Sequence, residues 1–269
     1  MPFSLQLNQD DIAPMLSIAI AAFSFCCYWF LFSSTTIKKS WCKKCPGDMG
    51  IIRHLLFVKN AGLVILGVLP MMLFIWMVPS YNFKMLGLSF NAETIFDSFK
   101  WIFVLGILIF AVMSYGSRRA KTFENYPQVR VRSWDLSLMV RYSMSWGIYM
   151  LGYEMLFRGL LLFPLVERFG VWPAIVINTA LYAVSHLPKG ADETYAAMFF
   201  GPLLCLVTLH TETIWAASCI HTILAVCNSV VALKFHPEFI IVKKRKSAGL
   251  SNELFHATGT TILDTSIIK

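Results

Sequence analysis

The chain has 269 residues, a formal net charge of +8, 57% hydrophobic residues and only 14% charged ones. Because soluble globular domains carry about 25% charged residues, this composition excludes an ordinary soluble protein and predicts a polytopic, all-α bundle in a membrane. The positive charge does not indicate nucleic-acid binding, because the basic residues lie in short runs between apolar segments.

Seven apolar segments have about the length of 20 residues that a helix needs to cross a bilayer. Their continuous apolar character argues against a membrane β-barrel, whose strands alternate. Asp10 and Asp11 precede the first segment, where a cleavable signal peptide would carry basic residues, so this segment is expected to remain as a helix. The predicted helices span Ile12–Phe32, Ala61–Val78, Trp101–Tyr115, Leu136–Phe163, Trp172–Leu187, Tyr195–Leu209 and Ile214–Leu233.

Three clusters of Lys and Arg lie on one side of the membrane if the chain crosses it seven times. By the positive-inside rule this side is the cytoplasm, which predicts an N-terminus outside and a C-terminus inside. The short loops favour a prokaryotic plasma membrane. The clusters are Lys38, Lys39, Lys43, Lys44 and Arg53 in the first loop, Arg118, Arg119, Lys121, Arg130 and Arg132 in the third, and Lys243, Lys244, Arg245 and Lys246 in the tail.

The helices and the basic clusters divide the chain into three parts. Residues 1–135 are expected to form an N-terminal membrane region of about three helices, and residues 136–235 a membrane core of about four helices. Residues 236–269 are expected to form a basic cytoplasmic tail in contact with lipid headgroups. The candidate functional residues all fall in the core.

The fourth predicted helix carries two charged residues, Glu154 and Arg158, inside an apolar stretch. A charge at the centre of a bilayer costs about 2.5–3.5 kcal/mol on insertion scales, so such residues usually face a partner or a wet cavity. Four residues are about one helical turn, which places both side chains on the same face. This stretch is therefore either a functional site or an ion pair that only neutralises itself.

Two later helices each contain a histidine, His186 and His221, in apolar sequence. One such histidine is more typical of a hydrogen-bonded packing residue, but charged and imidazole groups on three helices favour a common site. A carboxylate there can take a proton from water, and imidazoles can position the water or stabilise an oxyanion. We therefore predict hydrolysis that needs no cofactor, with Glu154 as the base and Arg158 orienting it or balancing its charge.

The same side chains leave a metal-dependent mechanism open. His186, His221 and Glu154 are an acceptable ligand set for a catalytic divalent metal such as zinc. Their spacing does not choose between the two mechanisms, because they lie on different helices. Cys42 and Cys45 form a C-x-x-C pair without a second ligand pair nearby and are not predicted to bind metal.

These segments resemble the motifs of the CAAX protease and bacteriocin-processing family, intramembrane proteases related to the type II CAAX prenyl endopeptidase. The family pattern has two adjacent glutamates before an arginine, an aromatic residue before a histidine, and a histidine before an asparagine. The resemblance covers about residues 137–231 and implies an endopeptidase that cleaves a membrane-associated peptide or protein. The matching residues are Glu154, Arg158, Tyr182, His186 and His221.

Two positions depart from the family pattern. Tyr153 stands in place of the first glutamate, which the resemblance implies is the water-activating base, and Ala225 stands in place of the asparagine. Glu154 is then expected to act as the base. Asn228 lies about 10 Å further along its helix than the last histidine and is not expected to replace the missing asparagine.

The aromatic residues and the departures leave further readings open. Tyr153 and Tyr182 are candidate substrate-binding residues, although packing explains Tyr182 equally well. The departures also fit a non-catalytic relative that acts as a membrane scaffold or as a bacteriocin-immunity-type binding protein. A transporter ranks last, because no inverted repeat or pair of broken helices is visible.

Overall fold

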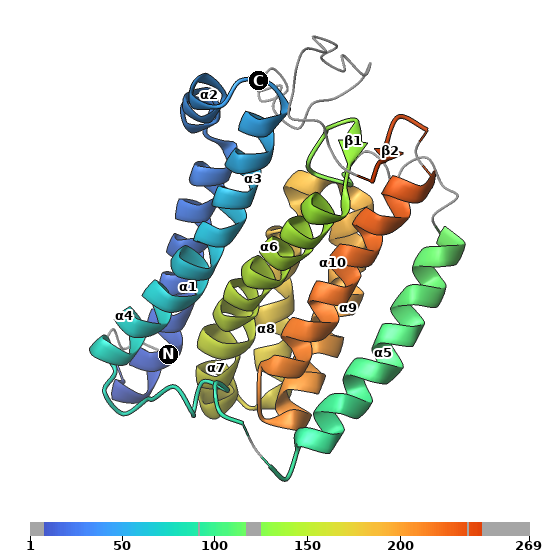
Figure 1. Cartoon of the computed structure of the whole chain (residues 1–269). Coiled ribbons are helices and arrows are strands. Elements are labelled where there is room, and N and C mark those ends of the chain that lie inside the picture. Colours follow the sequence, from blue (N-terminus) through green and yellow to red (C-terminus); the bar gives the residue numbers. More distant parts are fainter. Residues whose placement is uncertain (1–7, 91, 117–124, 236, 244–269) are drawn as a thin grey trace.

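The computed structural model describes residues 8–90, 92–116, 125–235 and 237–243. In these residues the chain is all-helical except for two strands of two residues each, and the long helices run side by side as a bundle (Figure 1). Six helical segments are long and apolar enough to cross a membrane, and Val171–Val184 is a shorter apolar helix. The predicted all-α fold is confirmed, and the long apolar helices indicate an integral membrane protein.

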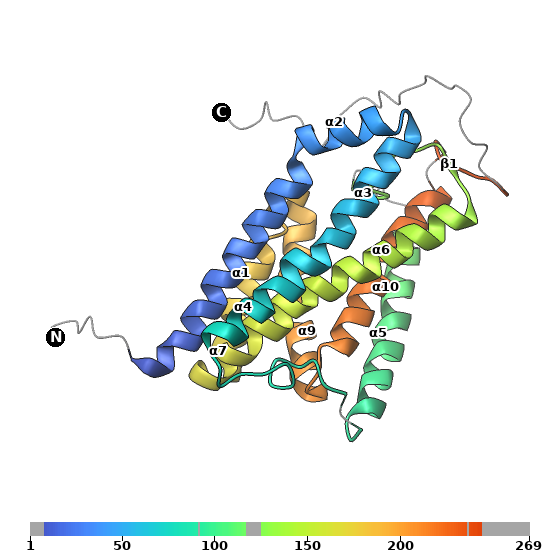
Figure 2. The ribbon, with the colours of Figure 1, turned by 60° about the vertical axis from the view of Figure 1, so that its left-hand side comes forward.

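The N-terminal half contains a helical pair and a longer run that is interrupted by a π-helical segment. Its elements are α1 (Gln9–Ser33), α2 (Thr35–Lys44), α3 (Asp48–Gly62), the π-helical η1 (Leu63–Val68), α4 (Leu69–Met77) and α5 (Ile95–Gly116). Ser34 ends α1 and caps α2, because its hydroxyl accepts a hydrogen bond from the Ile37 amide. This cap accounts for the corner between the two helices in Figure 2.

The C-terminal half also contains a long helical run that is interrupted by a π-helical segment. Its elements are β1 (Ser133–Trp134), α6 (Leu136–Glu154), the π-helical η3 (Met155–Leu161), α7 (Leu162–Phe169), α8 (Val171–Val184), the short 3₁₀ turn η4 (Leu187–Lys189), α9 (Ala191–Thr211), α10 (Trp215–Phe235) and β2 (Ile240–Ile241). Asp135 caps α6 by accepting a hydrogen bond from the Leu138 amide at 2.8 Å. Gly170, with a positive φ of 79°, allows the reversal between α7 and α8.

Several predicted helix ends are wrong, and one predicted loop contains a helix. The second predicted helix starts at Asp48 rather than Ala61, because Lys59, which is typical of a loop, is buried in the bundle. The ammonium of Lys59 lies 3.1 Å from the centroid of the Trp146 ring, and this cation–π contact stabilises a buried charge. The predicted first loop contains α2, and α8 ends at Val184, three residues before the predicted end at Leu187.

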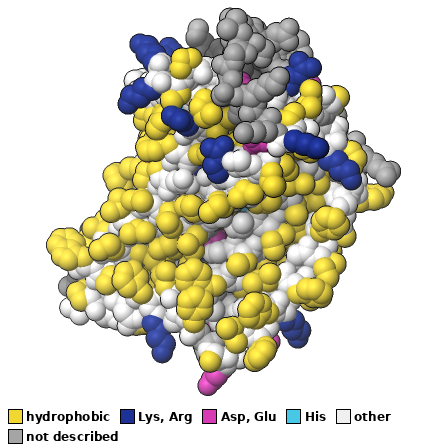
Figure 3. Space-filling view, in the orientation of Figure 1, with side chains coloured by type: hydrophobic (Ala, Val, Ile, Leu, Met, Phe, Trp, Pro, Cys, Tyr) yellow, Lys and Arg dark blue, Asp and Glu magenta, His cyan; other side chains and the backbone are white. Residues whose placement is uncertain are grey.

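The described parts of the three basic clusters share one end of the bundle. β1 and β2 pair in parallel, with Ser133 opposite Ile240, which brings the segment before α6 beside the segment after α10. α2 lies at the same end (Figure 1), and most Lys and Arg side chains in Figure 3 gather there. Arg118, Arg119, Lys121, Lys244, Arg245 and Lys246 lie outside the described residues.

Close glycine contacts join the two long helical runs beside their π-helical segments. A Cβ atom on Gly152 would lie 2.6 Å from the carbonyl oxygen of Gly62, and one on Gly67 would lie 2.8 Å from the sulfur of Met155. Small residues let membrane helices approach this closely. The crossing fixes the backbone that immediately precedes Glu154.

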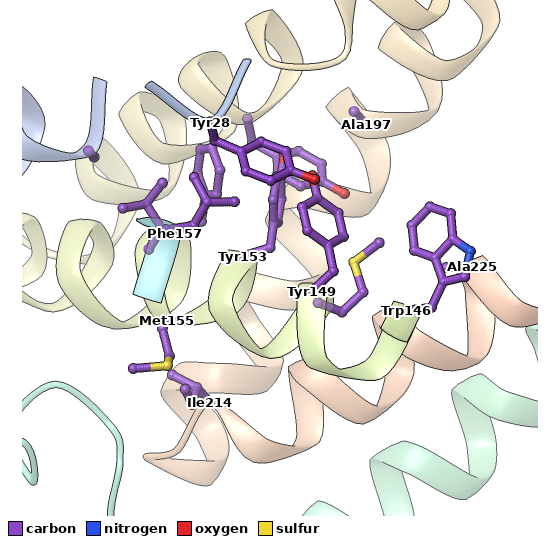
Figure 4. Close-up of a cluster of buried hydrophobic side chains, with 14 of the residues drawn as sticks. Tyr28, Trp146, Tyr149, Tyr153, Met155, Phe157, Ala197, Ile214 and Ala225 are labelled. Carbon is purple, nitrogen blue, oxygen red and sulfur yellow. The ribbon is translucent and has the colours of Figure 1, made fainter. Parts of the chain in front are cut away.

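Aromatic rings extend this contact along α6. Trp146 and Tyr149 have ring centroids 5.8 Å apart, as do Tyr149 and Tyr153, and Tyr28 of α1 stacks on Tyr149 at 5.2 Å (Figure 4). All four rings are buried. The ring series connects the packed N-terminal helices to the region around Glu154.

Candidate active site

Glu154 and Arg158 lie where α6 changes into η3. Glu154 is the last residue of α6, Arg158 belongs to η3, and both side chains have an exposed fraction of 0%. Their Oε2 and Nε atoms are 3.4 Å apart, so the residue spacing does bring the two charges together. Short π-helical segments widen a helix locally and occur often at functional sites.

His221 on α10 completes a buried core with this ion pair. Its Nδ1 lies 2.6 Å from Glu154 Oε1. Because an ionised carboxylate only accepts hydrogen bonds, Nδ1 carries the hydrogen, and the lone pair of a neutral imidazole is on Nε2. The Tyr182 hydroxyl lies 3.5 Å from that Nε2.

His186 lies beside this core, in the turn between α8 and η4. Its Nδ1 donates a hydrogen bond to the Tyr182 carbonyl at 2.9 Å, which again leaves the lone pair on Nε2. The His186 and Tyr182 ring centroids are 4.6 Å apart. Among the described residues, no hydrogen bond joins His186 to Glu154 or His221.

Tyr153 has a packing environment unlike that of a catalytic carboxylate. Its ring lies 4.6 Å from that of Phe157 and 5.6 Å from that of His221, measured between centroids. Its hydroxyl is 2.5 Å from the Ser185 hydroxyl, which donates to the Tyr182 carbonyl at 2.6 Å. Tyr153 therefore links α6 to the end of α8.

A cavity of about 650 Å³ lies against both predicted site histidines. Tyr182, His186 and His221 line it, whereas Glu154, Arg158 and Tyr153 lie behind them, outside the lining. Ala225 also lines it, so the departure from the family asparagine makes this wall more apolar. Asn228 lines the same wall two turns beyond His221.

Sequence reasoning missed other residues that line the cavity. Val112 and Met113 of α5 line it, together with Asn125 and Tyr126 from the segment before β1. The Asn125 amide donates to the Lys189 carbonyl at 3.0 Å and to Glu193 Oε1 at 3.1 Å. α5 carries no motif, so its apolar sequence gives no signal that distinguishes cavity residues from lipid-facing ones.

The core contains buried polar atoms that have no hydrogen-bond partner among the described residues. Glu154 Oε2, Arg158 Nε and Arg158 Nη1 have no hydrogen-bond partner among the described residues. Most buried polar atoms in proteins are hydrogen-bonded. Two of these atoms, Glu154 Oε2 and Arg158 Nε, face each other at 3.4 Å, so the attraction between opposite charges rather than a hydrogen bond joins them.

The residues do not form the predicted metal ligand set. In the part of the chain that the structure describes, no three His, Cys, Asp or Glu side chains are grouped so that they could hold a metal ion. Glu154, His186 and His221 therefore do not form such a group.

The region of the chain that contains the site is similar to a known protein family. Residues 132–227 match the profile of the family described as type II CAAX prenyl endopeptidase Rce1-like. The chain carries an Rce1-like domain. This Rce1-like domain occupies just over a third of the sequence, from the segment before α6 into α10, and contains all the predicted site residues. No curated protein and no solved structure matches the chain.

The family match agrees with the resemblance stated from the motifs. The family consists of endopeptidases, which are hydrolases that act on peptides or proteins. The buried Glu154–His221 pair is consistent with an active site of such an enzyme. Asn228 lies one residue beyond the matched segment.

Proposed function

We propose that this protein is an intramembrane endopeptidase that hydrolyses a peptide bond in a membrane-associated peptide or protein. The observation that carries the proposal is the 2.6 Å hydrogen bond between Glu154 and His221, beside Arg158 and at the wall of the cavity. A buried carboxylate–imidazole pair is suited to taking a proton from water. The match to an endopeptidase family supports the choice of a peptide bond.

In the proposed reaction, water loses a proton to the Glu154–His221 pair. The sequence predicted Glu154 as the base, but His221 lines the cavity and Glu154 does not, so we propose instead that His221 Nε2 accepts the proton. Glu154 holds Nδ1–H and stabilises the imidazolium. The water oxygen bonds to the substrate carbonyl carbon. The C–N bond then breaks, and the proton passes from His221 to the leaving amine.

The neighbouring residues orient this reaction. Tyr182 lines the cavity within 3.5 Å of His221 Nε2, so its hydroxyl can donate a hydrogen bond to the oxyanion that forms on the substrate. His186, with its lone pair on Nε2, is placed to accept a hydrogen bond from the attacking water. Arg158 balances the charge of Glu154 inside the bundle.

The surroundings of the cavity favour a substrate with an apolar segment. Met113, Phe200 and Leu224 are among its apolar lining residues, and the ion pair of Lys189 and Glu193, 3.5 Å apart, also lines it. We infer that the basic end of the bundle faces the cytoplasm of a prokaryotic plasma membrane and that the N-terminus is outside, as the positive-inside rule requires.

Isotope incorporation tests hydrolysis directly. Detergent-purified protein is incubated with a peptide library in H₂¹⁸O, with and without a strong chelator, and the products are analysed by mass spectrometry. We expect one ¹⁸O atom in each new carboxylate, about 10⁴-fold slower product formation with Glu154→Gln, and no effect of the chelator. Products that form equally with Glu154→Gln would contradict the proposal.

The same experiment addresses the alternative. Tyr153 and Ala225 favour a non-catalytic relative that binds a peptide or partner membrane protein. A complete lack of cleavage, combined with peptide binding that survives Glu154→Gln, would support that function instead.

A further inference from the structure

We infer that Asn178 is a positioning residue that holds the backbone of η3 so that Arg158 stays beside Glu154. Asn178 lies on α8, is fully buried, and has no role in the reaction described above. The catalytic consequence rests on the proposed function, whereas the positioning of Arg158 does not.

The Asn178 amide contacts the peptide unit from which Arg158 extends. Its Nδ2 donates a hydrogen bond of 2.6 Å to the carbonyl oxygen of Phe157. This carbonyl also accepts the amide hydrogen of Leu162, five residues further along the π-helical segment. The two donors together fix the plane of the peptide bond between Phe157 and Arg158.

The other end of the Asn178 amide is also held. Its Oδ1 accepts a hydrogen bond from the Cys205 thiol of α9 at 3.3 Å. A buried amide without partners would be costly, so two satisfied ends give this side chain one orientation. Asn178 thus ties η3 to both α8 and α9.

The guanidinium of Arg158 is fixed by the same two helices. Its Nη2 donates to the Gly201 carbonyl of α9 at 3.3 Å. Its central carbon lies 4.5 Å from the centroid of the Tyr182 ring, one turn beyond Asn178 on α8. With its backbone and its tip both held, Arg158 keeps Nε facing Glu154 Oε2 at 3.4 Å.

Loss of the Asn178 donor should therefore displace Arg158 relative to Glu154. A π-helical turn is a rare local geometry, and η3 would lose a side-chain bond that supports it. A displacement of about 1 Å in a catalytic group can lower a rate by about 10²-fold. We expect Asn178→Leu, which is close in size but has no donor, to lower kcat by about 10²-fold and to leave KM unchanged.

Three variants make the assay specific. Thr208→Val is the matched control, because Thr208 of α9 is fully buried and its hydroxyl has no hydrogen-bond partner among the described residues, so kcat should not change. Asn178→Ala is measured in parallel in case the leucine variant does not fold. The double variant of Asn178→Leu with Arg158→Gln should be no slower than Arg158→Gln alone, because both act through one group.

A measurement independent of activity separates this inference from the proposed function. In protein labelled with ¹⁵N-arginine, the Nε–H resonance of Arg158 is assigned by its loss in Arg158→Lys. We expect this resonance to shift in Asn178→Leu or Asn178→Ala and to stay in place in Thr208→Val. The inference would be overturned if the resonance did not move. It would also be overturned if the double variant lost kcat by the product of the two single-variant losses. A shifted resonance in a protein that cleaves nothing would retain the positioning role and reject the proposed function.

Discussion

α5 and the run formed by α6, η3 and α7 are both apolar helical segments, yet their surroundings differ. In the most apolar stretch of α5, 11% of the residues are buried. In the most apolar stretch of Leu136–Phe169, 78% are buried. α5 directs large side chains outward, and Phe103 is 69% exposed, whereas Glu154 and Arg158 are completely enclosed. Hydrophobicity places both segments in the membrane, but only the one surrounded by protein can carry charges and a reaction.

The largest contrast is expected between two histidines. His221→Ala should lower kcat by about 10²–10⁴-fold, because it removes the proposed proton acceptor. His210→Ala is the control, since His210 is exposed at the end of α9 and its Nδ1 accepts a hydrogen bond from Trp101 at 3.2 Å. Cleavage by purified protein of equal abundance measures both. Equal rates for the two variants would remove the functional distinction between the buried and exposed positions.

A second carboxylate in the buried run should be harmful. Tyr153→Glu restores the family pattern, but it breaks the contact with Ser185 and places an uncompensated charge beside Glu154. A buried unpaired charge costs about 3–5 kcal/mol. We expect a lower unfolding midpoint in detergent and lower cleavage. A large gain in activity would instead mean that Tyr153 impairs the natural enzyme.

Shortening a side chain should lower the free energy of unfolding more in the buried run than in α5. Leu160→Ala in η3 should destabilise the protein by about 2–5 kcal/mol, because Leu160 is 0% exposed and its removal leaves a cavity. Leu108→Ala in α5 should stay within about 0.5 kcal/mol, since Leu108 is 53% exposed. Equilibrium unfolding in mixed micelles compares the pair. Similar losses would mean that α5 is packed in the native protein.

Two glycines give the smallest contrast. A methyl group on Gly152 would lie 2.6 Å from a backbone oxygen of Gly62, whereas one on Gly106 would meet only Ile223 at 3.7 Å. Gly152→Ala should therefore cost about 1–3 kcal/mol, and Gly106→Ala should be neutral or stabilise α5 by up to about 1 kcal/mol. The same unfolding assay measures both, and a neutral Gly152→Ala would contradict the close crossing of the two runs.

Most of the helices could be predicted because their apolar runs match the thickness of a bilayer. The start of α3 could not, since a lysine such as Lys59 is typical of a loop, and the rings that it contacts, Trp146 and Tyr149, lie 87 or more residues later in the chain. Local composition also gives no indication of η1 and η3, which lie beside the crossing at Gly62 and Gly152.

The site was only partly predictable for the same reason. Glu154 and Arg158 were identifiable because charges in an apolar stretch need an explanation. Their bond to His221 joins residues 67 positions apart, and the contact between Asn178 and Phe157 joins separate helices, so neither follows from spacing. The cavity wall from α5 carries no polar residue that would reveal it.

The most direct test of the account compares cleavage by the wild type and by Glu154→Gln, each purified in detergent and matched for abundance and unfolding midpoint. The substitution keeps the size of the side chain, so the bundle should remain intact. We predict that the wild type cleaves a quenched fluorescent peptide library and that Glu154→Gln is slower by about 10⁴-fold, as expected when the carboxylate that orients a catalytic imidazole is lost. Equal cleavage by the two proteins would show that the buried pair of Glu154 and His221 is not the reactive centre.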